Sequence, residues 1–235
     1  MTIESEPNGP LLAIPQELAN RDRPKRWLSL IVVLLVMICL AFVAGLSFWW
    51  GRHTVTLPGE GSAEVGFARD MAAHHAQAVD MATLLRDRTS DPEMHTLALD
   101  IMLTQQAQIG QMQGWLAVWG QANVGLGPAM AWAGMPTSGS MPGMASAADL
   151  NRLRTLTNEA ADGLFLQLMI AHHQAGVMMA QAILARTQRP EVRALAQAIV
   201  NAQESEITYM QTLRKRKGLP PAPVMPDMNQ TPMTH

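Results

Sequence analysis

Two short motifs in this chain each combine a pair of adjacent histidines with methionines at the same spacing. The first consists of Met71, His74, His75 and Met81, and the second of Met169, His172, His173 and Met179. In each motif one methionine lies three residues before the first histidine and another lies seven residues after it. Imidazole nitrogen and thioether sulfur are ligands for soft and borderline metal ions. The pattern therefore predicts metal binding.

The two motifs lie within an internal duplication. Residues 67–116 align with residues 165–214 at a shift of 98 positions and give 19 identities in 50 positions without a gap. A repeat of this length predicts two copies of one structural unit. The two histidine pairs are thus expected at equivalent places in the fold.

The choice of metal follows from the ligand types. On a helix, residues three or four apart share a face, so Met71 can approach the same ion as His74 or His75. Adjacent histidines diverge by about 100°, so one of each pair is expected to face the core and the other a groove or the partner hairpin. Imidazole with thioether favours copper, Cu(I) above all, over hard ions. Zinc bound by His172, His173 and Glu206 is the alternative.

The supply of other soft ligands is uneven along the chain. Cys39 is the only cysteine, and 16 of the 18 methionines follow the apolar segment that contains it. Single methionines at helical spacing are typical of a core. The interpretation of the loop methionines stays open between ligands and incidental composition; these are Met130, Met135, Met141 and Met144.

A single apolar segment precedes the duplicated region. Residues 27–50 contain no charge over 24 positions, enough to cross a bilayer core of about 30 Å. Four basic residues between 21 and 26 come before this segment, which predicts a cytoplasmic tail over 1–26, a transmembrane anchor over 27–50 and an extracytoplasmic remainder. A cleaved signal peptide is the alternative.

The rest of the chain predicts an all-α fold. After a linker over 51–62, apolar residues at helical spacing predict helices over about 63–88 and 92–119, and again over 158–186 and 190–217. Two amphipathic hairpins, 63–119 and 158–217, are expected to bury their apolar faces in one four-helix bundle over 63–217. A Met/Gly/Pro-rich crossover over 120–157, with a short helix starting at Ser146, connects them, and 218–235 is expected to be a flexible Met/Pro-rich tail.

The hairpin turns also predict which residues lie at one level. With the first turn near residue 90, His74 is expected level with Gln105, and Met71 with Gln108. The second copy gives the equivalent pairs, His172 with Gln203 and Met169 with Glu206. Buried polar groups need partners. These clusters can therefore bind a metal or simply form hydrogen bonds in a polar core layer.

Several function classes lack support in the sequence. The net charge of −2 gives no basic excess for a nucleic-acid partner. No paired carboxylates, serine–histidine–acid set or cysteine nucleophile indicates an enzyme. A di-iron site needs Glu-x-x-His on two helices, and neither histidine pair has a glutamate three residues before it.

The motif Phe-x-x-x-Met-x-x-His-His-x-x-x-Val-x-Met-Ala occurs at 67–82 and again at 165–180, and each copy is followed by Pro-Glu and a Gln-x-x-x-Ile-x-x-Met helix. This pattern resembles the bacterial family called domain of unknown function 305. The resemblance implies a ferritin-like helical bundle, export and, as in some members, copper binding. It gives the ligand role to the motif histidines and methionines, while Gln108 against Glu206 makes the two copies unequal.

The leading hypothesis is therefore a membrane-anchored copper-binding protein of the cell envelope that sequesters the ion or hands it to an envelope metal-transfer partner. A non-catalytic interaction or assembly module, with structural histidine pairs, is the second hypothesis. A metal oxidase is a third and weaker one.

Overall fold

The computed structural model describes residues 26–51 and 56–222, and these contain helices and no strand. The chain divides into two compact units, 1–56 and 57–235. The all-α class predicted from the sequence is confirmed.

The first unit contains helix α1, Arg26–Gly51. Its stretch Trp27–Trp49 is the one helical segment in the described part of the chain that is long and apolar enough to cross a membrane. Its apolar side chains are exposed, as is Cys39. A signal sequence would share these features of length, composition and position near the N-terminus.

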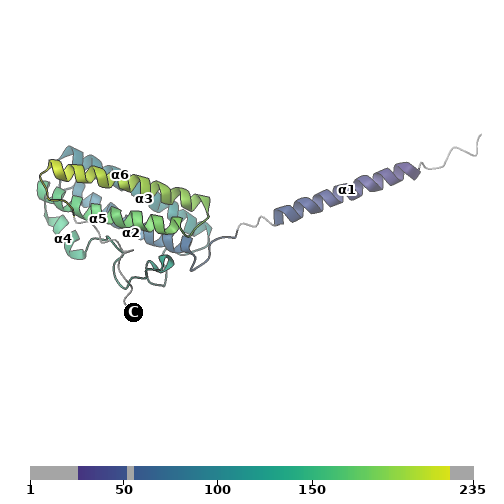
Figure 1. The fold of residues 1–235 in the computed structure, drawn as a ribbon, viewed down its shortest axis with the longest axis horizontal. Coiled ribbons are helices and arrows are strands. Elements are labelled where there is room, and N and C mark those ends of the chain that lie inside the picture. The colour runs from purple at the N-terminus through teal and green to yellow at the C-terminus, as the bar shows by residue number, and fades with distance from the viewer. Residues whose placement is uncertain (1–25, 52–55, 223–235) are drawn as a thin grey trace, which may run out of the picture. The chain divides into compact units, whose positions relative to one another are not determined.

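The second unit is a bundle of four long helices, shown side by side in Figure 1. These are α2 (Ala63–Arg86), α3 (Pro92–Val118), α5 (Asn158–Leu184) and α6 (Pro190–Arg216). Helices α2 and α3 form one hairpin, α5 and α6 form the other, and α2 packs directly on α5. The short helix α4 (Ala147–Thr155) and a 3₁₀ turn, η2 (Ala131–Ala133), lie in the crossover between the hairpins.

Local sequence signals set the helix ends. Asp91 caps α3 by accepting a hydrogen bond from the Glu93 backbone N–H, with Pro92 in the first turn. Ser146 caps α4 in the same way through the Asp149 N–H, as its sequence predicts. Gly218, at φ +64°, follows the end of α6, because a left-handed residue there suits glycine.

The core consists of two apolar clusters, one toward each end of the bundle. One cluster joins the start of α2 to the end of α5, and the other joins the end of α2 to the start of α5. The two central helices therefore run antiparallel, and the duplicated hairpins are related by an approximate two-fold axis. The histidine pairs fall between the clusters in both helices.

The crossover is ordered and contributes to the core. Met130 and Met141 are buried in the first cluster, and Met135 and Met144 pack against it. From the sequence alone, the role of these methionines stays open between ligands and incidental composition. The structure shows that they fill core space beside α2 and α5. The predicted tail methionines at 225, 228 and 233 lie outside the described residues.

Candidate metal centre

A layer of six polar side chains crosses the middle of the bundle, and we call it the histidine layer. Its members are His74, His75, Gln105, His172, His173 and Gln203. All four histidines are fully buried and the two glutamines are almost so. Of the two orientations expected for the other histidine of each pair, the groove is not observed, because α2 is covered by α3 and α5 and α5 by α2 and α6. The partner hairpin is observed, because His74 and His172 face each other across the two hairpins.

The two hairpins meet through their histidines. The rings of His74 and His172 stack with centroids 3.7 Å apart and planes 29° from parallel. Nε2 of His172 donates a hydrogen bond of 2.9 Å to the backbone carbonyl of His74. Residues 98 positions apart in the duplication thus form one contact at the centre of the bundle.

The crossover covers this stack. Nε2 of His74 donates to the Pro142 carbonyl over 3.2 Å. The segment 141–145 is held to α2 by a double hydrogen bond between the Gln77 side chain and the Ala145 backbone. Gly143, at φ +73°, presses against α5, where a Cβ atom would lie 2.6 Å from the Ala171 carbonyl oxygen. We call residues 141–145 the covering segment.

The second histidine of each pair reaches outward within its own hairpin. Nε2 of His75 lies 2.7 Å from Oε1 of Gln108, and Nε2 of His173 lies 2.6 Å from Oε2 of Glu206. The Glu206 side chain is 24% exposed. The two copies thus use equivalent contacts with different chemistry, an amide in one and a carboxylate in the other.

These contacts fix the protonation pattern of the rings. Each Nε2 faces a carbonyl, amide or carboxylate oxygen, which accepts and does not donate, so each Nε2 carries the proton. In a neutral ring, Nδ1 is then left with a bare lone pair. All four Nδ1 atoms are buried and have no hydrogen-bond partner, and the same holds for the Gln105 and Gln203 amides. Buried polar atoms of this kind are rare in native proteins and indicate a missing ligand, ion or water.

Burial keeps the rings of His74, His75 and His172 neutral. Desolvation lowers the pKa of His74 to about 4 and that of His75 to about 3, and it lowers the pKa of His172 well below its ordinary value. Coulombic interactions among the neighbouring rings add to the shift. A neutral imidazole is the form that binds metal.

The motif methionines flank the histidine layer on both sides. Met71 and Met179 lie in the first apolar cluster, and Met81 and Met169 in the second. All four are fully buried. Each cluster therefore contributes one thioether from α2 and one from α5.

Other predicted pairings are not formed. Gln105 and Gln203 make no hydrogen bond to the histidines, so the hydrogen-bonded core layer of the second hypothesis is absent in that form. The described residues contain no group of three or more His, Cys, Asp or Glu side chains placed to hold a metal. The zinc set of His172, His173 and Glu206 is therefore not assembled, because His172 turns toward α2 while His173 turns toward α6.

Comparison with known proteins decides the family. Residues 64–214 match the family described as Domain of unknown function (DUF305). The chain belongs to this family. The structure is similar to a DUF305 protein from Streptomyces coelicolor, with 43% identity and a TM-score of 0.67 over 71% of this chain and 100% of that one. A DUF305 fragment from Deinococcus radiodurans is 41% identical, with a TM-score of 0.57 over 66% of this chain and 96% of that one.

A third similar structure was solved with copper bound. The structure of CopM in the Cu(II)-bound form is 33% identical to this chain, with a TM-score of 0.54 over 65% of this chain and 96% of CopM. No curated protein matches the chain.

Sequence reasoning missed two parts of this DUF305 site. The covering segment supplies a backbone carbonyl to His74, and a carbonyl leaves no trace in a side-chain pattern. Gly176 also went unnoticed, although a Cβ there would lie 2.3 Å from Oε1 of Gln203. Its counterpart in the first copy is Ala78, so a comparison of the two copies could have indicated it.

Proposed function

We propose that this chain is a copper-binding protein of the cell envelope, held by α1 in the membrane with the bundle on the extracytoplasmic side, that sequesters copper or passes it on. The observation that carries the proposal is the set of four buried imidazoles whose Nε2 atoms are all hydrogen-bonded and whose Nδ1 atoms are all free. Metal-binding histidines typically donate their other N–H to a carbonyl or carboxylate. The histidine layer has this arrangement.

The donor set fits copper. We propose Nδ1 of His74, His75, His172 and His173 as ligands that act singly with neighbouring thioethers, and not as one four-imidazole set, because the four rings are not grouped around one point. Thioethers on either side, from Met71 and Met179 and from Met81 and Met169, favour Cu(I). CopM, a relative with a Cu(II)-bound structure, supports copper as the metal. We propose that Glu206 acts through His173. Its carboxylate accepts the hydrogen bond from Nε2 of His173, and this contact makes the ring a stronger metal ligand.

The test separates a ligand role from a structural one. In His172→Gln with His173→Gln, each glutamine amide can replace the Nε2 donor, while Nδ1 is lost. We expect the full chain in detergent to stay folded and to lose tight Cu(I) binding in an anaerobic titration against a competing chelator. Zn(II) titrated in parallel serves as the control for metal selectivity.

Two further variants keep this test decisive. His172→Ala with His173→Ala removes both nitrogens and is expected to lower copper stoichiometry and stability together. His95→Gln, on the outer part of α3, should leave binding unchanged. Wild-type Cu(I) affinity in the double glutamine variant would contradict the site assignment and return the histidines to a structural role.

A further inference from the structure

An uncharged loop at one end of the bundle exposes apolar side chains. Residues 101–148 contain no Asp, Glu, Lys, Arg or His over 48 positions. Within this run, Val124 is 79% exposed and Leu126 fully so. Val118, at the end of α3, is exposed beside them in the sequence. Val124 and Leu126 thus present apolar side chains to the surroundings from one short loop.

The loop has a fixed shape. Gly120, at φ +69°, ends α3. The Arg69 side chain then donates from Nε to the Ala122 carbonyl over 2.7 Å. Gly125 lies against the same guanidinium, where a Cβ atom would be 3.2 Å from Nη1 of Arg69. Val124 and Leu126 flank Gly125, which packs against Arg69, and both of their side chains are exposed.

The segment that enters the bundle from α1 lies beside this loop. Arg69 also pairs with Glu60 through both carboxylate oxygens, at 2.6 and 2.8 Å. Residues 60–62 and residues 123–125 line one cavity of about 450 Å³ on the surface of α2. Leu57, just before this segment, is exposed as well. Arg69 therefore connects the loop, at Ala122, with the segment that leads into α2, at Glu60.

Only a short connection separates α1 from the segment that begins at Leu57. Five residues, 52–56, separate Gly51, the last residue of α1, from Leu57. Six such steps span at most about 20 Å. If α1 crosses a bilayer, the loop lies within reach of the lipid surface from which the chain emerges.

We propose that residues 121–127 contact the bilayer surface, with Val124 and Leu126 inserted among the lipids. This inference rests on the part of the proposed function in which α1 is a membrane anchor. The absence of charge favours it, since charged side chains are costly below the headgroups. The contact would hold the bundle against the membrane through a second point besides α1.

The test uses the full chain in phosphatidylcholine liposomes. The sole native cysteine, Cys39 in α1, reports on the anchor through its protection from an aqueous thiol reagent. In a Cys39→Ser background, Leu126→Cys and Val124→Cys carry an environment-sensitive fluorophore. Leu103→Cys is the matched control, because Leu103 is 59% exposed but lies about 22 Å along α3 from Val118.

We expect the fluorophore at 124 and 126 to show blue-shifted emission, quenching by lipids labelled near the headgroup and little quenching by aqueous iodide. The probe at 103 should show the reverse. Iodide quenching at 126 equal to that at 103, with Cys39 protected, would overturn the inference and leave the anchor intact. Shielding from both quenchers would also overturn it and point to a protein partner. Reaction of Cys39 with the aqueous reagent would overturn the anchor itself.

Discussion

His172 stacks on His74, and its Nε2–H donates a hydrogen bond to the His74 backbone carbonyl. The two copies of the duplicated motif therefore contact each other ring to ring at the centre of the bundle. This contact is stable only while both rings are neutral, because two imidazolium rings 3.7 Å apart would repel each other in a desolvated site. The stack therefore couples protonation to folding.

The metal-free protein should lose stability in mild acid. His74 has a folded pKa of about 4, whereas an unfolded histidine titrates near 6.5, so the unfolded chain binds the proton more tightly. The stability is fully present above pH 6.5 and falls as the pH drops toward 4, by about 3 kcal/mol from His74 alone. Urea denaturation between pH 7.5 and 4.5 measures the slope.

The matched variant for this prediction is His74→Gln, which retains a side-chain N–H for Pro142 but cannot titrate. Its stability should change less steeply over the same pH range than that of the wild type. Identical slopes would mean that His74 is not a source of the pH dependence.

The two copies differ in the side chain that contacts the second histidine, which is Gln108 in one copy and Glu206 in the other, so each residue can be replaced by its counterpart. Glu206→Gln gives His173 the neutral partner that His75 has in the first copy, and Gln108→Glu does the opposite. Loss of a carboxylate partner typically weakens metal binding about 10- to 100-fold. We expect weaker copper binding in Glu206→Gln and tighter binding in Gln108→Glu, measured by chelator competition. The same direction of change in both would refute a role through the imidazoles.

The covering segment depends on Gly143. In Gly143→Ala the new Cβ would meet the Ala171 carbonyl and the Ala175 side chain at a positive φ. Left-handed strain and overpacking together should cost about 2–4 kcal/mol in unfolding free energy, seen in urea denaturation. Gly139→Ala, in the same crossover with open space around it, is the control and should be close to neutral.

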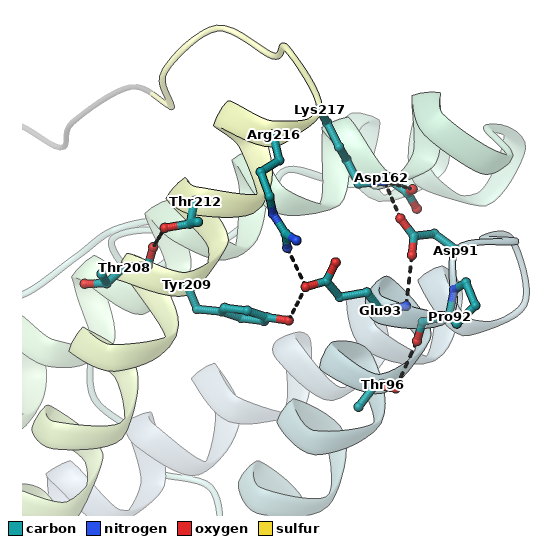
Figure 2. Close-up of polar contacts among 10 residues, drawn as sticks. All are labelled: Asp91, Pro92, Glu93, Thr96, Asp162, Thr208, Tyr209, Thr212, Arg216 and Lys217. Carbon is teal, nitrogen blue, oxygen red and sulfur yellow. Dashed lines mark hydrogen bonds and ion pairs between the residues drawn. The ribbon is translucent and has the colours of Figure 1, made fainter.

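An ion pair with one buried partner lies at the end of the bundle where α3 and α5 begin and α6 ends (Figure 2). Lys217 lies between Asp91 and Asp162, with Nζ 3.0 Å from an Asp162 carboxylate that is 2% exposed. Lys217→Met leaves that carboxylate buried without its cation, and we expect a loss of about 3 kcal/mol. Differential scanning calorimetry measures it, and adding Asp162→Asn should recover much of the loss.

The neighbouring pair in Figure 2 is the control for Lys217. Arg216 pairs with Glu93 at the surface, where both side chains are substantially exposed. Exposed pairs are screened by solvent and contribute little, so Arg216→Met should have little effect. Equal losses in the two variants would show that burial does not decide the strength of these pairs.

Much of the fold could be predicted from the sequence because its signals are local. Asp91-Pro92 and Ser146 start helices, Gly218 ends one, and the shift of 98 positions gives two equivalent hairpins. The burial of His74 and His172 together could also be inferred from the apolar spacing around them. The helix ends and the burial of the histidines each depend on residues within a few turns of one helix, and the duplication is a direct comparison of two stretches of sequence.

The partners of the histidines could not be predicted in the same way. Counting from the hairpin turn gives the height of Gln105 opposite His74 but says nothing about rotation around the helix axis. The structure instead pairs His75 with Gln108, one turn further along α3. The role of the loop methionines stays open from the sequence because a Gly/Pro-rich composition predicts turns but not whether other elements leave room for the loop to pack.

The duplicated hairpins are nearly symmetric, but a single polypeptide can join them only once. That one connection runs across the histidine stack, where Pro142 accepts from His74 and Gly143 seals the surface of α5. The equivalent place on the second copy receives the backbone of α2 instead. Fusion of two equal halves thus gives two equivalent histidines unequal surroundings, with a crossover carbonyl against His74 and the backbone of α2 against His172.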